Sequence, residues 1–130
     1  MKKAVAEVLD GQPNALKKSD ILSACDLDTR VVPVPEWGGE ITLGTMTAAA
    51  RDLYEQEISK YAGKEVLIEN MRARYLAYCV IDPETGELMF KSSDIQALGA
   101  KNGEVIGRLF SAACLLNATG IEGMEDVTKN

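Results

Sequence analysis

Histidine is absent from all 130 residues of the sequence. Ser–His and Cys–His schemes, in which an imidazole activates the nucleophile, are therefore excluded. Cysteine is scarce: Cys25, Cys79 and Cys114 are odd in number and widely spaced, so neither a disulfide framework nor a zinc site is predicted. We expect a protein that is not an enzyme and that holds no cofactor and no metal ion.

Long apolar runs are also missing. The N-terminal segment from Ala4 to Leu9 is interrupted by Glu7, which does not fit the apolar part of a signal peptide. No segment approaches the roughly 20 apolar residues that span a bilayer. The net charge of −6 argues against nucleic-acid binding, because such binding needs clustered Lys and Arg side chains. A cytoplasmic protein that contacts neither membrane nor nucleic acid is the expectation.

The acidic and glycine-containing segments show no spacing that suits a bound ion. Asp82, Glu84 and Glu87 lie in a turn-like sequence that lacks the glycine and the terminal glutamate of a calcium loop. Glycine recurs between Gly99 and Gly107 without the spacing of a phosphate loop. These segments are predicted to be solvated turns and helix ends.

Two short apolar runs flank Gly38-Gly39 in the stretch Thr29–Asp52, a pattern typical of a β-hairpin. The turn could hold two residues, Gly38-Gly39, or three, with Trp37 added. A two-residue turn would place Pro35 where the partner strand requires an N–H donor, which proline lacks. A three-residue turn closed by the pair Glu36–Glu40 avoids that conflict. The prolines therefore favour the three-residue turn.

This register divides the side chains of the hairpin between two faces. One face is predicted to be apolar and to pack on helices, and it carries Val31, Pro33, Pro35, Ile41 and Leu43. The other face is predicted to be mainly polar, and it carries Val32 and Val34 beside Glu36, Glu40 and Thr42.

Trp37 lies at the predicted hairpin tip. A large amphipathic side chain in this position could anchor a protein partner. It could instead fold back over the apolar face and cover the edge of the core. Both interpretations stay open, and the candidate partner-binding residues are Trp37, Val32 and Val34.

Helical periodicity follows the hairpin. One helix is predicted from a cap at Thr45 or Thr47 to Gly63. A second is predicted from Lys64 to Ile81, and its second half is apolar on all sides, which indicates a central helix. The remaining predicted elements are a short helical turn capped by Ser19, a turn at 82–87, an extended segment at 88–90, a helix opened by a Ser93–Gln96 capping box and closed by Gly99, and a helix from about Gly103 to Leu116.

These elements predict an α+β fold that is mostly helical, with one N-terminal β-hairpin packed on a bundle of about four helices. Residues 1–18 are predicted to form a flexible N-terminal arm, residues 19–120 a single domain, and residues 121–130 a flexible acidic tail.

Several short motifs follow one another in a distinctive order between about residues 20 and 118. They are Val32-Pro33-Val34-Pro35-Glu36-Trp37-Gly38-Gly39, Ile41-Thr42-Leu43, Thr47 through Tyr54, Arg72-Ala73-Arg74-Tyr75-Leu76, Val80-Ile81-Asp82, Gly86-Glu87-Leu88-Met89-Phe90, Asp94-Ile95, Leu98-Gly99 and Arg108-Leu109-Phe110. This ordered set resembles the small tail assembly chaperones of long-tailed bacteriophages and prophages.

The resemblance implies a non-enzymatic protein that binds the tape measure protein during tail assembly, keeps it soluble and helps recruit tail tube subunits. It also implies action in the host bacterial cytoplasm and absence from the mature virion. Alternatives are a structural virion component, such as a tail terminator or head–tail connector, and a generic small adaptor. Homo-oligomerisation stays open, because the apolar segment 75–81 could be covered by another copy.

Overall fold

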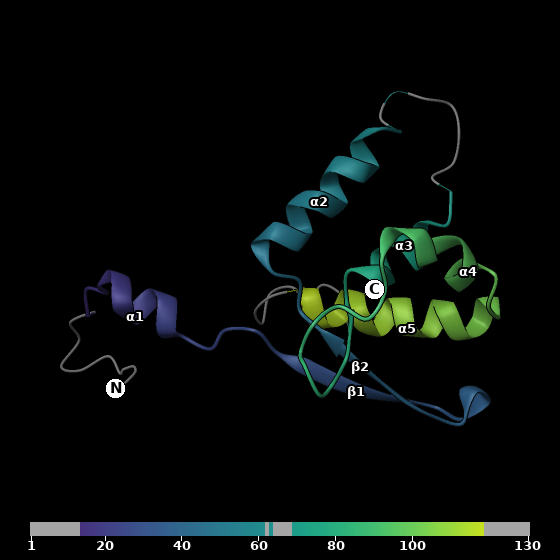
Figure 1. Cartoon of the computed structure of the whole chain (residues 1–130), viewed down its shortest axis with the longest axis horizontal. Coiled ribbons are helices and arrows are strands. Elements are labelled where there is room, and N and C mark those ends of the chain that lie inside the picture. The colour runs from purple at the N-terminus through teal and green to yellow at the C-terminus, as the bar shows by residue number, and fades with distance from the viewer. Residues whose placement is uncertain (1–13, 62, 64–68, 119–130) are drawn as a thin grey trace, which may run out of the picture.

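The computed structural model describes residues 14–61, 63 and 69–118. Their fold is α+β and mostly helical, as predicted (Figure 1). Residues 1–13 of the predicted arm and the whole predicted tail, 121–130, lie outside the described residues. The elements in chain order are α1 (Lys18–Ser23), β1 (Thr29–Val34), the 3₁₀ turn η1 (Pro35–Trp37), β2 (Gly39–Gly44), α2 (Ala48–Ser59), α3 (Met71–Ala77), β3 (Val80–Ile81), the 3₁₀ turn η2 (Ser92–Asp94), α4 (Ile95–Gly99) and α5 (Gly103–Asn117).

The three described strands form one antiparallel sheet in the order β1-β2-β3. The N-terminal hairpin formed by β1 and β2 confirms the prediction. The short strand β3, which pairs with Thr42 and Leu43 of β2, was not predicted.

The register of the hairpin differs from both predicted alternatives. Val34 pairs with Gly39, so the loop contains four residues, from Pro35 to Gly38. The first three form η1, and Gly38 follows in the left-handed region at φ 79°. Proline suits the start of such a turn because its fixed φ fits and its missing N–H needs no partner there. The predictions were wrong because they kept Pro35 in the strand.

The observed register places the valines of β1 differently from the prediction. Val32 and Val34 are 8% and 0% exposed and belong to the core, whereas Val31 is 52% exposed. Residues directly opposite in an antiparallel pair share a face, and Val32 lies opposite Ile41. The expectation that Val32 and Val34 lie on the polar outer face is therefore wrong.

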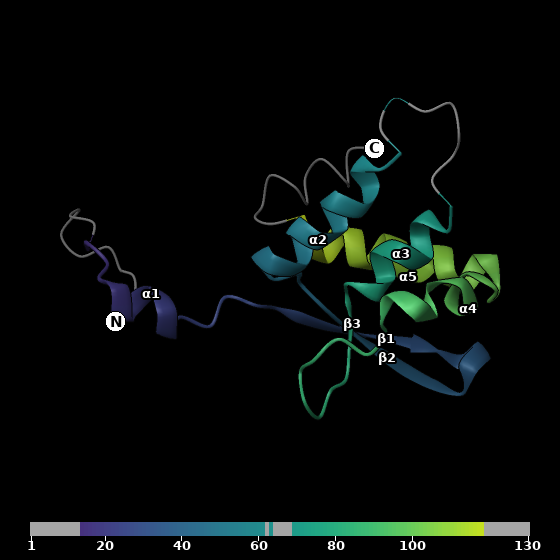
Figure 2. The ribbon, with the colours of Figure 1, turned by 45° about the horizontal axis from the view of Figure 1, so that its top comes forward.

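Helices α3, α4 and α5 lie on the same side of the sheet (Figure 2). The buried face of the hairpin packs against them, and the opposite face is open, as antiparallel sheets allow. The core formed between the two layers contains Val32, Val34, Leu43, Ala73, Leu76, Ala77, Cys79, Val80, Ile95, Leu98, Val105, Ile106, Leu109 and Ala113.

Helix α2 starts at the second of the two predicted caps. The hydroxyl oxygen of Thr47 accepts a hydrogen bond from the backbone N–H of Ala50 at 3.0 Å. This bond satisfies one of the free N–H groups of the first turn. The helix ends at Ser59, before the predicted stop at Gly63.

The predicted helix from Lys64 to Ile81 is wrong over much of its length. Helix α3 covers only Met71–Ala77, and Val80–Ile81 is strand β3. Residues 64–68 lie outside the described residues. A short apolar run fits a buried helix and a buried strand equally well, and the β-branched side chains of Val80 and Ile81 favour the strand once β2 lies beside them.

The last helix follows its prediction closely. Asn102 caps α5, since its side-chain oxygen accepts hydrogen bonds from the N–H groups of Glu104 and Val105 at 2.8 and 3.1 Å. Of the side chains predicted to point inward, Leu116 packs against the core, Phe110 is half-buried with its ring against that of Tyr75, and four are buried: Val105, Ile106, Leu109 and Ala113.

Two predicted capping contacts are replaced by neighbouring ones. Before α4, the backbone N–H of Lys91 donates to the carboxylate of Asp94 at 2.8 Å, instead of the expected Ser93–Gln96 box. At α1, the N–H of Lys17 donates to Asp20 at 2.9 Å, and Ser19 lies inside the helix. In both places the sequence marked the right segment and the wrong residue.

Candidate functional site

The indole of Trp37 stands at the end of η1, on the tip of the hairpin. The turn is closed by a hydrogen bond from the N–H of Gly38 to the carbonyl oxygen of Pro35 at 3.1 Å. The side chain of Trp37 is 38% exposed, so it is partly covered by the fold and partly open to solvent. The two interpretations drawn from the sequence, partner anchor and core cover, are therefore compatible with each other.

An ion pair ties the hairpin tip to α5. The Arg108 guanidinium donates two hydrogen bonds to the carboxylate of Glu36, at 2.7 and 3.2 Å. Hydrogen bonding from Arg108 holds the pKa of the Glu36 carboxyl below its usual value. The pair is solvent-exposed, so its contribution is mainly to fix the direction of the tip rather than to stabilise the fold.

Trp37 forms one wall of an apolar hollow with a volume of about 300 Å³. The opposite walls come from β2, from the segment that precedes η2, and from α4. We call this surface the Trp37 hollow; its apolar members are Trp37, Ile41, Phe90, Ala97 and Leu98, and Asp94 and Lys101 stand with them as charged members. An amphipathic aromatic side chain beside an apolar depression is the kind of feature that carries binding energy in protein interfaces.

Of the three candidate residues, the structure places only Trp37 at this hollow. Val32 and Val34 are buried in the core, so neither side chain lines the Trp37 hollow. Sequence reasoning missed Phe90 and Leu98 as members of the site. Each lies in an element that the sequence did mark, but their closeness to Trp37 depends on tertiary packing that no local pattern reports.

A second cluster of polar side chains joins α2 to α3. The Arg74 guanidinium donates to one oxygen of Glu57 at 2.8 Å, and the Tyr78 hydroxyl donates to the other at 2.5 Å. Burial alone would raise the pKa of Glu57, but the hydrogen bonds from Tyr78 and Arg74 together outweigh it and lower that pKa. Burial and the bond to Glu57 raise the pKa of Tyr78 to about 12. A phenol with that pKa stays protonated at neutral pH, so the cluster is suited to holding two helices together and not to proton transfer.

Two of the cysteines, Cys79 and Cys114, do not carry activated thiols. Burial raises the pKa of Cys79 to about 12 and also raises the pKa of Cys114. Thiols of this kind are inert, because the thiolate is the reactive form. Residues 14–61, 63 and 69–118 contain no group of His, Cys, Asp and Glu side chains arranged to hold a metal ion. Among these residues there is also no helix with the length and apolar character needed to cross a bilayer.

The residues described thus define a small α+β protein with an apolar hollow beside a partly exposed tryptophan. No family model matches the sequence, and no curated protein matches it. Among solved structures, the fold is similar to that of the tail assembly chaperone of bacteriophage HK97. The similarity has a TM-score of 0.55 at 16% sequence identity and covers 78% of this chain and 94% of that chain. The resemblance inferred from the sequence motifs is thereby confirmed at the level of the fold.

Proposed function

We propose that this protein is a tail assembly chaperone of a phage or prophage. In this role it is not an enzyme: it binds the tape measure protein in the host cytoplasm during tail morphogenesis and recruits tail tube subunits. The observation that carries the proposal is the shared fold, which extends over 94% of the HK97 tail assembly chaperone. The ordered sequence motifs between residues 20 and 118 support the same assignment.

The Trp37 hollow is the proposed contact surface for the tape measure protein. Its apolar walls suit one or two apolar side chains of a helical or extended segment, and Trp37 provides an amphipathic edge that can close over them. Leu88 and Met89, 43% and 44% exposed, precede Phe90 and extend the apolar surface along the chain. Asp94 and Lys101 can pair with charges of either sign that flank such a segment.

A shallow hollow of this size matches a chaperone that must release its client. Few side chains are buried on binding, so the expected affinity is moderate, and several weak contacts along a long client keep its apolar surface covered. The net charge of −6 favours solubility of the resulting complex.

Co-expression with the tape measure protein encoded in the same phage or prophage genome tests the proposal. The tape measure protein is expected to stay soluble and to co-purify with this chain. Trp37→Ala should reduce co-purification at least about tenfold, because truncating an aromatic anchor in a protein interface commonly costs about 2 kcal/mol or more. Val31→Ala is the matched control, since Val31 is exposed on the opposite face of the same hairpin.

Two results would contradict the proposal. One is a tape measure protein that is equally soluble with and without this chain and that never co-purifies with it. The other is the presence of stoichiometric copies in purified mature particles, measured by mass spectrometry, which would indicate a structural component such as a tail terminator or connector.

A further inference from the structure

Helix α1 stands away from the rest of the fold, at the end of an extended linker (Figures 1 and 2). None of its six residues is buried. Ile21 and Leu22 are 57% and 73% exposed, and Leu16, just before the helix, is 67% exposed. A helix this short is not stable alone in water, so its apolar side chains need a surface to lie against.

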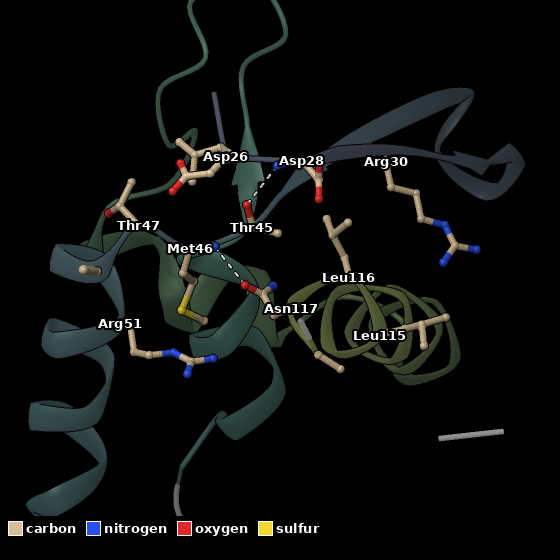
Figure 3. A pocket seen from close by; sticks show the side chains of 13 residues that line it. Asp26, Asp28, Arg30, Thr45, Met46, Thr47, Arg51, Leu115, Leu116 and Asn117 are labelled. Carbon is tan, nitrogen blue, oxygen red and sulfur yellow. Dashed lines mark hydrogen bonds between the residues drawn. The ribbon is translucent and has the colours of Figure 1, made fainter. Parts of the chain in front are cut away.

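We call α1 together with its linker the projecting arm. A second hollow, separate from the Trp37 hollow, lies where this projecting arm joins the domain. Its volume is about 780 Å³, and its walls come from the linker, the β2–α2 junction, the first turns of α2 and the end of α5 (Figure 3). We call it the arm-base pocket; its apolar lining consists of Leu27, Met46, Ala48, Leu115, Leu116 and Ala118. Apolar lining of this extent suits the side chains of an amphipathic helix.

The chain's own α1 is poorly placed to enter this pocket. The linker forms one wall of it, because the N–H of Asp28 donates to the Thr45 hydroxyl at 3.1 Å and the N–H of Thr45 donates to the carbonyl of Asp28 at 3.0 Å. Ala24, which ends α1, is extended at ψ 138° and directs the helix outward. Only Cys25 lies between Ala24 and Asp26, which already lines the pocket. One residue spans about 3.5 Å, too little for a helix to reverse its direction without breaking that wall.

We propose that the arm-base pocket receives α1 from a second copy of this chain. Each chain offers one projecting arm and one pocket, so two copies related by a twofold axis can exchange arms and leave neither unpartnered. Exchange of an identical element is a low-cost route to a dimer, because the same contacts form twice. The reciprocal arrangement also compensates for the small area that one short helix can bury.

The arm and the pocket each carry charges of both signs. Asp26 and Asp28 lie on the linker side of the pocket, and Arg51 lies on the α2 side (Figure 3). Helix α1 carries Lys18 at its start and Asp20 in its first turn. A helix with both signs can therefore meet a pocket with both signs while its apolar side chains face the apolar lining.

Site-directed crosslinking of the full-length chain tests the exchange. In a Cys25→Ser background, one preparation carries Leu22→Cys and another carries Ala48→Cys, and the two are mixed under mild oxidation. A disulfide between the two different chains is expected to form at least about ten times faster than in a matched mixture of Leu22→Cys with Leu88→Cys. Leu88 is an exposed leucine on the β3–η2 connection, outside the pocket.

Two crosslinking outcomes would overturn the proposal. Equal crosslinking rates for Ala48→Cys and Leu88→Cys would show that the arm does not dock in the pocket. A chain carrying both Leu22→Cys and Ala48→Cys that closes the disulfide within itself at every dilution would show that the pocket holds its own arm.

Light scattering provides the second measurement. Leu22→Ser should raise the dimer dissociation constant at least about tenfold, and Leu88→Ser should leave that constant unchanged. A wild-type chain that is monomeric up to millimolar concentration would contradict the exchange.

Discussion

The carboxylate of Glu57 holds α2 to α3 through two different donors. Arg74 supplies a charged guanidinium and Tyr78 supplies a hydroxyl, one to each carboxylate oxygen. Helix α2 has only one buried residue, Ala50, so its attachment depends on such side-chain contacts more than that of α5 does. The protonation state of a single carboxyl group therefore affects how two helices are joined.

We expect the free energy of unfolding to depend on Glu57 in acid. Because the pKa of Glu57 is lowered in the folded protein, the folded state binds fewer protons than the unfolded state between the two pKa values. The stabilisation is fully present above the ordinary carboxyl pKa of 4.5 and is lost as the pH falls through the lower folded value. Glu57→Gln should lower the free energy of unfolding at pH 7 by about 1–2 kcal/mol and should weaken its decline in acid.

Urea unfolding between pH 3 and pH 7 measures both effects of Glu57→Gln. Glu55→Gln removes an exposed carboxyl group from the same helix and serves as the control. If both variants lose stability in acid as steeply as the wild type, Glu57 is not the group responsible.

At the level of whole elements, the sequence predicts those whose signals are local. The cap of α2 and the inward face of α5 depend on residues three or four positions apart. Thr47 is one of the two caps that the sequence allowed for α2, and the inward face of α5 was predicted. The hairpin register was predicted wrongly. It depends on whether Pro35 ends the strand or starts the turn, and in the structure Pro35 starts the 3₁₀ turn. Strand β3 was missed because an apolar pair such as Val80–Ile81 becomes a strand only when another strand lies beside it.

Asn117, at the end of α5, contacts the segment that connects β2 to α2. Its side-chain oxygen accepts from the backbone N–H of Met46 at 2.8 Å, and its amide nitrogen donates to the carbonyl of Ala113 at 2.9 Å. Asn117 is 8% exposed and its bond to Met46 is partly buried, so removal of the amide would take away the hydrogen-bond partner of the Met46 N–H. The sequence places Asn117 just beyond the predicted end of the helix at Leu116 and does not predict this contact, because Met46 is 71 positions away.

Asn117→Ala should therefore destabilise the fold by about 2–3 kcal/mol, the cost of leaving the partly buried backbone donor of Met46 without its protein partner together with the lost side-chain contacts of Asn117. Asn102→Ala is a useful comparison, since it removes an exposed cap of the same helix and should cost about 1 kcal/mol. Thermal or urea unfolding measures both variants. Equal losses would mean that water replaces the Asn117 oxygen at Met46.

For the molecule as a whole, the fold shared with the HK97 chaperone at 16% identity indicates that pattern and volume, rather than particular side chains, specify this architecture. Because the packing of distant elements forms the Trp37 hollow, the sequence alone predicted only one of its residues. Trp37 was identified because it is large, amphipathic and next to a turn. Its neighbours Phe90 and Leu98 come from elements more than 50 positions away, and only the packed layers bring them to the same hollow.

The proposed arm exchange would give the whole molecule two levels of stability, one within the domain and one between copies. The double change Ile21→Ser and Leu22→Ser should leave the free energy of unfolding unchanged at low protein concentration, because both side chains are exposed in the single chain. The wild-type melting temperature should rise with protein concentration, since association stabilises the folded state by mass action. The doubly substituted chain should lose this concentration dependence, whereas Leu88→Ser should keep it. Calorimetry over a hundredfold range of concentration measures the difference, and a wild-type melting temperature that is constant over that range would mean that the arms do not join two copies.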